Sequence, residues 1–449
     1  MVARRSLGAN YRKLFAATTI SNLGDGVSLI AYPWLATAVT RNPLLIALVA
    51  VVQRLPWLLF TLPAGVITDR NDRRKLMIGA NTIRFVITAL VALAVLARGG
   101  TLPAPDEVDS VVGTEWFLYL VLLIATLMLG TCEVLHDNSA QTFLPAVVDD
   151  PDLEQANGQM YSAEIVANQF AGPPLASLML ATGFVLPILF DAGSFAVAAG
   201  LVFTIVATRP AEPAPVPTAR RAFKQELAEG FRWLWHHPLL RTFAITLGFL
   251  NMLNQVYFAT LVLYGQEVLH TSAFQFGLMT TLSAVGGVLG GWLGSRIARR
   301  IGAGASVQLT MWSGGVCVLL AGLVSRWPLV ALLLGLTMFT GILWNVITVS
   351  LRQAVIPDRL LGRVNSVYRF FGWGMMPIGS LIGGALVAVL DGPLSREWAL
   401  RMPWIVAGAS QLVLALVVVR SLSSARIDAV RAGGKVEDLD VSAIGSASR

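Results

Sequence analysis

Long apolar stretches alternate with short polar connections along the chain, and this alternation constrains the fold more than any other feature. Each stretch approaches or exceeds about 20 residues, the length that an α-helix needs to cross about 30 Å of hydrocarbon. Inside a bilayer every backbone hydrogen bond must be made internally, which favours helices. Only 13% of the 449 residues are charged, against about 25% in soluble domains. The sequence therefore predicts an all-α, multi-pass membrane protein.

Twelve such stretches nearly fill the chain and leave no room for a large soluble domain. The predicted spans are Leu14–Val39, Leu44–Thr68, Leu76–Ala97, Trp116–Phe143, Gln159–Thr182, Val185–Ala207, Leu239–Tyr264, Phe274–Ser295, Ser306–Ser325, Pro328–Leu351, Val364–Leu390 and Met402–Val419. We expect six-helix bundles at residues 1–207 and 239–420. A cytoplasmic linker at 208–238 joins them, and a tail at 421–449 is predicted to be disordered.

Basic residues indicate the orientation of these spans. Lys and Arg concentrate at the two termini, in the linker and in alternate loops, which marks that side as cytoplasmic. The loop Val147–Gly158 is acidic and departs from this bias without overturning it. Arginine greatly outnumbers lysine, as in GC-rich bacteria. We therefore expect a protein of the bacterial inner membrane with both termini inside. The net charge of +7 reflects this topology, and we expect no nucleic-acid partner.

The linker has two parts of different character. Its first part contains four prolines, which exclude a helix and predict an extended chain. Its second part places apolar residues at helical spacing, which predicts an amphipathic helix on the inner membrane surface or packed against the protein itself. Those residues are Phe223, Leu227, Phe231 and Leu234.

Features of enzymes and metal proteins are missing from the sequence. Cys132 and Cys317 are isolated within apolar spans, and the four histidines lack ligand spacing. Neither a Walker loop nor a His-Glu-x-x-His pattern occurs. We expect no cofactor, no metal and no direct use of ATP. A membrane-embedded enzyme or sensor remains a remote alternative.

Equivalent sequence signals recur six helices apart. The segment Gly65–Arg74 has a counterpart in Gly291–Arg300, each placing a glycine before a basic cluster. Gln141 with Pro145 is matched by Gln353 with Pro357, and a proline and a serine recur in the fifth and eleventh spans. Such repetition predicts two pseudo-symmetric halves around a central cavity, a usual solution for secondary transporters.

The segment Gly65-Val66-Ile67-Thr68-Asp69-Arg70-Asn71-Asp72-Arg73-Arg74-Lys75 resembles the loop signature of the major facilitator superfamily. Its Asp-Arg-x-Asp-Arg-Arg form is similar to the drug:proton antiporter branch that includes the enterobactin exporter. Asn22–Gly26, Asp191–Phe195, Glu229–Leu234 and Gly362–Ser366 extend the resemblance over nearly the whole chain. The resemblance implies the major facilitator fold, a small-molecule substrate and no enzymatic activity, and we expect a monomer.

The same resemblance implies an inner gate. Its residues would be Gly65, Asp69, Arg70, Arg73 and Arg74, with Asp137 as the partner of Arg73. This chain departs from the family pattern in two places. Thr126 stands where an arginine linked to proton transfer is common, and Ala176-Ser177 replaces a usual glycine pair.

Charges near the middle of a membrane cost several kcal/mol unless paired or hydrated. Asp25 and Arg54 lie near the midplane of their spans, and Glu133 lies nearly as deep in the fourth. We expect Asp25 to carry a coupling proton, with Glu133 in reserve and Arg54 as a neighbouring cation. A static ion pair that fixes helix packing is an equal alternative for Asp25, and the favoured role for Arg54.

A substrate cavity would need apolar and hydrogen-bonding walls. The candidates from the sequence are Trp34, Trp57, Asn251, Asn254, Gln255, Tyr257 and Trp344. Packing between helices explains such residues equally well.

These observations favour a secondary transporter that exports an amphipathic small molecule, a drug or a siderophore, by proton antiport. Proton-coupled uptake of a small molecule or lipid remains the alternative within transport, because the fold does not set direction.

Overall fold

The computed structural model describes residues 7–100, 102–206 and 219–431, and the protein is helical over almost all of them. Within these ranges, eleven helices are long and apolar enough to cross a membrane. The chain divides into two compact units. Unit 1 contains the helices of the first sequence half together with Gly265–Thr281, and unit 2 contains the linker helix and the rest of the second half.

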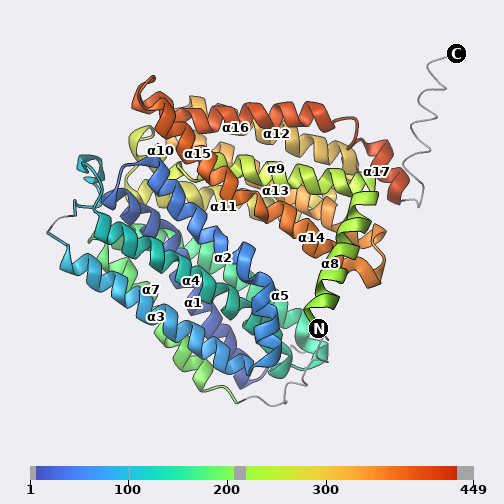
Figure 1. Cartoon of the computed structure of the whole chain (residues 1–449), viewed down its shortest axis with the longest axis horizontal. Coiled ribbons are helices and arrows are strands. Elements are labelled where there is room, and N and C mark those ends of the chain that lie inside the picture. The colour runs from blue at the N-terminus through green and yellow to red at the C-terminus, as the bar shows by residue number, and fades with distance from the viewer. Residues whose placement is uncertain (1–6, 101, 207–218, 432–449) are drawn as a thin grey trace. The chain divides into compact units, whose positions relative to one another are not determined.

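The helices of the first half, coloured blue to green in Figure 1, belong to unit 1. Their bounds are α1 Ala9–Val39, α2 Pro43–Arg70, α3 Arg73–Ala97, α4 Trp116–Phe143, α5 Leu153–Ile165, α6 Gly172–Leu180 and α7 Val185–Phe203. Short 3-10 turns lie at Val108–Ser110, Leu144–Ala146 and Asp150–Asp152. Helix α1 packs against α7 and α6, while α3 packs against α4 and α7.

The remaining helices lie in the linker, the second half and the tail. They are α8 Ala219–His236, α9 Pro238–Phe258, α10 Leu261–Glu267, α11 Ala273–Ile301, α12 Ala303–Leu323, α13 Trp327–Val355, α14 Asp358–Gly374, α15 Met376–Leu390, α16 Arg396–Val418 and α17 Ser424–Arg431. Segments α9 with α10, and α14 with α15, each make one apolar span. Two of the predicted spans thus consist of consecutive helical pieces.

The predicted fifth span is interrupted in the same way. It is helical from Leu153 to Leu180 but contains a π-helical segment, η4, at Val166–Ala171 between α5 and α6. Pro173 and Pro174 carry no amide hydrogen, so carbonyls one turn earlier lack their α-helical donors. Neither piece is long enough to count among the eleven, which reconciles that number with the twelve predicted from the sequence.

Glycines allow pairs of helices in both units to touch through their backbones. In unit 1, a Cβ atom on Gly172 would lie 2.4 Å from the carbonyl carbon of Gly26 in α1. In unit 2, a Cβ atom on Gly286 or Gly290 of α11 would lie 1.9 or 2.5 Å from a backbone oxygen of α13. Gly379 and Gly383 of α15 likewise meet α9. Spacing small residues four apart is a usual way to bring membrane helices together.

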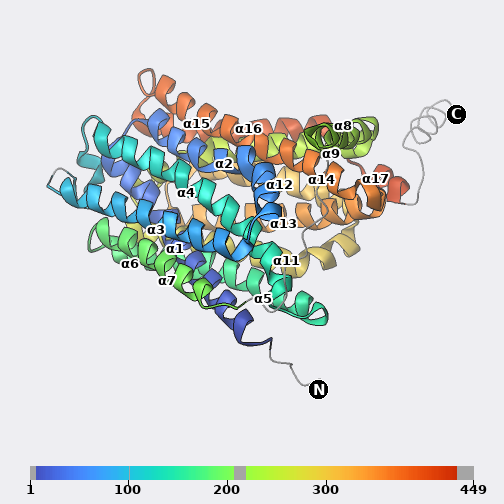
Figure 2. The same ribbon diagram turned by 60° about the horizontal axis from the view of Figure 1, so that its bottom comes forward.

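The linker and the tail both contain helices that pack on unit 2. Helix α8 lies against α14 (Figure 2), where Glu229 forms an ion pair with Arg363. Of the two positions considered for the linker helix, the described part therefore packs on the protein itself. Helix α17 lies within the tail that we expected to be disordered, and Ile427 is fully buried there. Residues 207–218 and 432–449 lie outside the described part.

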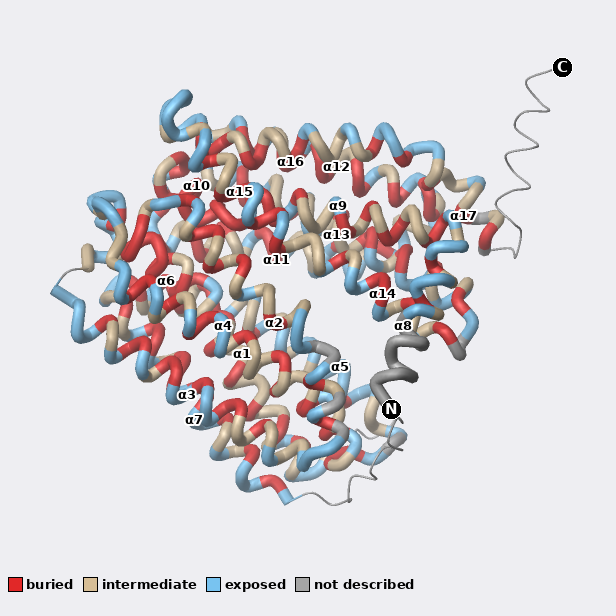
Figure 3. Tube along the Cα trace, viewed as in Figure 1, coloured by how far each residue is buried: buried red, intermediate tan, exposed pale blue. Residues whose placement is uncertain are grey.

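Exposed residues recur along the helices of both units, where Figure 3 marks them in pale blue. Many of them are large apolar residues. On α3, for example, Leu90 and Leu93 are 58% and 60% exposed, and on α16 Val417 is 71% exposed. Soluble proteins avoid large continuous apolar surfaces of this kind. The exposed faces are those that hydrocarbon would cover.

The segment Gly265–Thr281 is attached to unit 1 by a polar clamp. Arg41, which lies between α1 and α2, donates to Gln266 Oε1 and Glu267 Oε1, both at 2.5 Å, and to Asp109 Oδ1 at 2.9 Å. The Gln266 amide also donates to Thr37 of α1 at 3.0 Å. These contacts tie the end of α10 to the helices of the first half.

Candidate functional site

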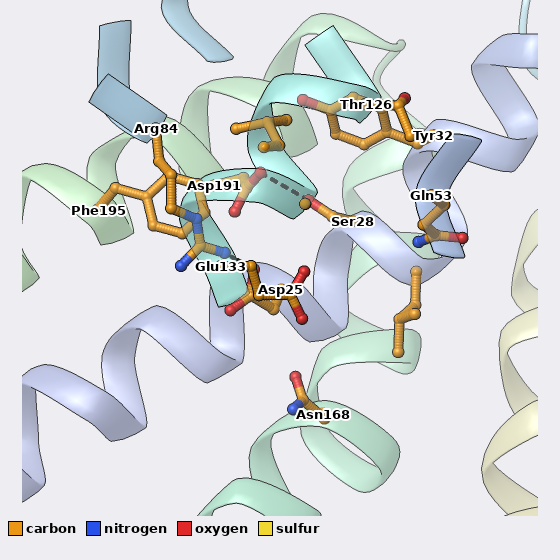
Figure 4. Close-up of a pocket in the computed structure, with 13 residues that line it drawn as sticks. Asp25, Ser28, Tyr32, Gln53, Arg84, Thr126, Glu133, Asn168, Asp191 and Phe195 are labelled. Atoms are coloured by element: carbon orange, nitrogen blue, oxygen red, sulfur yellow. Dashed lines mark hydrogen bonds and ion pairs between the residues drawn. The ribbon is translucent and has the colours of Figure 1, made fainter. Parts of the chain in front are cut away.

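A polar cavity of about 140 Å³ lies among the helices of unit 1. Its wall comes from α1, α2, α3, α4, η4 and α7, so nearly every segment of the first half contributes. Figure 4 shows the charged side chains gathered around one guanidinium group. The polar lining residues are Asp25, Ser28, Tyr32, Gln53, Arg84, Thr126, Glu133, Asn168 and Asp191.

Arg84 of α3 is the cation at the centre of this group. Its side chain is only 3% exposed, and Nη2 forms an ion pair with Asp25 Oδ1 of α1. Nη1 donates to Ser21 at 3.4 Å, and the guanidinium lies 3.9 Å from the ring centroid of Phe195. A buried charge is tolerated when it is paired in this way. The sequence placed Arg54 beside Asp25, and the structure corrects that pairing to Arg84.

Asp191 of α7 occupies the other side of the cavity. Ser28 donates to Asp191 Oδ2 at 2.6 Å, while Oδ1 is buried and has no hydrogen-bond partner in the described part of the chain. The carboxylate reaches α1 because Gly24 has no side chain, and a Cβ there would lie 2.7 Å from Asp191 Oδ1. The Asp-Ala-Gly-Ser-Phe stretch of the sequence thus supplies a cavity residue.

Glu133 of α4 is the third acid in the wall. It makes no hydrogen bond and no ion pair with any residue that the structure describes, although Arg54 of α2 lies within electrostatic range. Arg54 itself does not line the cavity. The group therefore contains three carboxylates but only two guanidinium groups, counting Arg54 and Arg84.

Sequence reasoning missed several uncharged members of the site. Ser28 and Tyr32 follow Asp25 at helical spacing on the same face of α1, and Gln53 directly precedes Arg54. That spacing was the available signal. Asn168 had no comparable signal, because its position depends on the π-helical segment, where it donates to Asn22 at 3.1 Å.

None of the cavity residues proposed from the sequence lines this cavity. Trp34 donates to the carbonyl of Pro105 at 2.8 Å and packs edge-on against Phe276. In unit 2, the ring of Trp344 lies edge-on against that of Phe243, and the ring of Tyr257 lies tilted against that of Trp404. The other candidates occupy several environments: Trp57 is partly buried, Asn251 donates to the Gly372 carbonyl, Asn254 is exposed and Gln255 is buried.

The predicted gate residues bind the ends of neighbouring helices. Arg73 donates to the Thr142 carbonyl in the last turn of α4 at 2.9 Å. Arg74 donates to carbonyls at the end of α7, including that of Val202 at 3.2 Å. Cations at helix C-termini are stabilised by the exposed carbonyls and the helix dipole.

The predicted pair of Arg73 with Asp137 is not formed in this structure. Asp137 lies beside His136, with 3.3 Å between Oδ1 and Nδ1. Arg70 is exposed, and a Cβ on Gly65 would have open space around it. The side chain of Asp69 lies outside the described part.

The acids of the cavity do not converge as metal ligands would. Among the described residues, no three His, Cys, Asp or Glu side chains are arranged to hold a metal ion. The arrangement instead offers separated carboxylates that protons or a hydrogen-bonding cation can reach.

The sequence profile of the Major Facilitator Superfamily matches residues 14–380. The chain belongs to that superfamily. Family membership and the eleven apolar helices identify a multi-pass membrane transporter rather than an enzyme, as the sequence predicted. A transporter of this family acts on a small-molecule substrate.

Two relatives with named activities cover nearly the whole chain. The multidrug efflux pump Tap of Mycolicibacterium fortuitum is 24% identical over 408 residues, which are 89% of this chain and 94% of Tap. The enterobactin exporter EntS of Citrobacter koseri is 25% identical over 414 residues, 91% of this chain and 89% of EntS. The predicted resemblance to the enterobactin exporter is thereby confirmed.

Solved structures show the same fold. A bacterial homologue of the iron transporter ferroportin, in an inward-facing state, aligns with a TM-score of 0.69 and 17% identity, covering 93% of this chain and all of that one. The nucleoside transporter NupG aligns with a TM-score of 0.72 and 12% identity, covering 92% of this chain and all of NupG. These similarities confirm the major facilitator fold.

Proposed function

We propose that this protein exports an amphipathic small molecule from the bacterial cell in exchange for protons. The observation that carries the proposal is the excess of carboxylates over arginines in and beside the cavity of unit 1, where Asp25, Glu133 and Asp191 face Arg84 and the neighbouring Arg54. With all three carboxylates and both guanidinium groups ionised, this set of side chains would carry one net negative charge. One bound proton neutralises that charge. Uncompensated charge inside a membrane is costly, so a proton or another cation is needed there.

Glu133 is the better proton carrier of the two acids considered from the sequence. Asp25 is held in an ion pair with Arg84, so protonating it would leave a buried guanidinium without its partner. Glu133 has no such bond to lose. His136 and Asp137 follow Glu133 one turn along α4 and lie beside each other.

Export is favoured over uptake by the two named relatives. Tap is a multidrug efflux pump and EntS is an enterobactin exporter, and each matches this chain over most of its length. The corresponding location is the inner membrane, with both termini cytoplasmic and the protein acting as a monomer. Uptake by proton symport is the competing function.

A deletion strain tests the proposal. Export predicts that the strain retains a drug or an endogenous metabolite that the parent strain releases, and that the plasmid-borne gene restores release. Lower intracellular levels of a supplied nutrient in the deletion strain, with normal secretion, would support uptake instead. The compound so identified is then the substrate for flux measurements in proteoliposomes.

A further inference from the structure

The wall of the cavity in unit 1 contains carboxylate oxygens that neither arginine binds, and one of them is fully buried. Asp191 is 2% exposed, and its Oδ1 atom has no hydrogen-bond partner among the described residues. Glu133, which is partly exposed in the cavity wall, makes no hydrogen bond or ion pair with any described residue, whereas Arg84 is paired with Asp25. Buried polar atoms of this kind normally have partners, so each unused one requires an explanation.

A neutral side chain in the cavity wall, Tyr32, also has an unused polar atom. Tyr32 is 8% exposed and lines the cavity one turn beyond Ser28, which binds Asp191. Its hydroxyl lies near Thr88 Oγ1, yet neither oxygen has a hydrogen-bond partner of acceptable geometry in the described part. A bound group that carries several N–H donors would satisfy both the hydroxyl and the carboxylates.

We propose that this cavity binds the ammonium or amidinium head group of an organic cation, with Glu133 and Asp191 as its acceptors. The remainder of the molecule extends from the cavity, since about 140 Å³ holds only a head group and its first carbon atoms. This proposal rests on the proposed transport function and adds the charge class of the substrate.

An organic cation fits this site better than a metal ion does. Divalent metals need several oxygen ligands that converge at about 2.0–2.6 Å, and the described acids do not form such a group. An ammonium group instead donates separate hydrogen bonds to acceptors on different helices. Bonds from a cation to a carboxylate are about twice as strong as neutral ones.

Equilibrium binding to the purified full-length protein tests the proposal. The probes are 4-phenylbutylamine, which is an ammonium ion at pH 7.4, and 4-phenyl-1-butanol, which has the same body without the charge. Each is titrated in detergent, without any pH gradient, and binding is measured as a saturable rise in the unfolding temperature. We expect the amine to bind and the alcohol to bind at least about tenfold more weakly.

Two variants locate the binding. Glu133→Gln and Asp191→Asn should each weaken amine binding by about tenfold or more, because each loses a charged acceptor. Glu154→Gln, which changes an exposed acid of α5 outside the cavity, should bind the amine as the parent protein does. If Asp191→Asn fails to fold, Glu133→Gln alone decides.

Equal affinity for the amine and the alcohol, or unchanged amine affinity in the folded cavity variants, would overturn the cation site. The result is separable from proton coupling. Loss of the cation site with intact pH-driven efflux removes only this inference, while intact amine binding without pH-driven efflux removes only the proposed coupling.

Discussion

Arg84 contacts three neighbours inside unit 1, and these contacts show how individual residues hold the polar group together. It pairs with Asp25, donates to Ser21 and lies over the ring of Phe195. Removing one partner of a buried ion pair leaves the other charge uncompensated, which typically costs about 3–5 kcal/mol. Removing both partners costs less, because no isolated charge remains.

Arg84→Gln should therefore lower the thermal stability of the detergent-purified protein sharply. Adding Asp25→Asn to the same chain should restore part of that loss. A cycle of the two single variants and the double variant, followed by thermal unfolding, measures the coupling between the two residues. Strictly additive effects would show that the pair contributes nothing to stability.

The candidate acids could be predicted from the sequence, but their partners could not. Asp25 and Glu133 stand out because a carboxylate deep in an apolar stretch requires an explanation. Arg54 and Arg84 both lie inside predicted spans, and depth alone cannot choose between them. Which arginine pairs with Asp25 depends on how the helices are rotated about their axes. Close contacts such as that of Gly24 with Ser194 and Asp191 determine this rotation.

At the scale of elements, the crossing of α1 with the interrupted fifth span brings Asn168 to the cavity. The contact depends on Gly172, which meets the backbone of Gly26. The sequence predicted the span but not its π-helical segment, because apolar periodicity carries no information about a local change in hydrogen bonding. Pro173 and Pro174 were the sequence signal that indicated an interrupted helix.

Gly172→Ala should destabilise the protein by roughly 1–3 kcal/mol, because the added methyl group has no space. Gly79→Ala is the matched control, since a Cβ there would meet nothing within 4 Å. It should be neutral or slightly stabilising, as alanine is the better helix former. Thermal unfolding by fluorescence-detected size exclusion compares the two, and equal stabilities would refute the close crossing.

The clamp at Arg41 is the second element-scale feature. Arg41→Gln removes the charged bonds to Glu267 and Asp109. Amide hydrogen exchange in Gly265–Thr281 should then accelerate by about tenfold. Arg98→Gln, which loses a longer and more exposed pair with Glu115, should leave this segment unchanged. Exchange that is equally slow in both variants would show that the clamp does not hold the segment.

At the scale of the whole molecule, the two sequence halves share a helix pattern but differ in charge. The duplicated signals predicted the common architecture, and the fold comparisons confirm it. The cavity acids, however, all come from α1, α4 and α7 of the first half. We infer that ion coupling belongs to unit 1.

The orientation in the membrane is a prediction of the same scale. Asn71→Cys and Asp106→Cys each place a thiol at an exposed position in a connection between helices. In intact cells an impermeant maleimide should label the cysteine at 106 and should reach the one at 71 only after the membrane is opened. The reverse pattern would place the termini outside and reverse the proposed direction of transport.

Flux in proteoliposomes tests the central claim most directly, namely that the acids of unit 1 couple protons to transport. Protein is reconstituted with the substrate found by the deletion strain, a pH gradient is imposed, and initial rates are compared for the parent, Glu133→Gln and Glu154→Gln proteins. We predict that the gradient drives substrate against its concentration in the parent and in Glu154→Gln. Glu133→Gln should lose this driven flux yet still exchange substrate that is supplied at a concentration high enough to offset its weaker binding. Driven flux of equal rate in Glu133→Gln, or flux in the parent that ignores the gradient, would contradict the account.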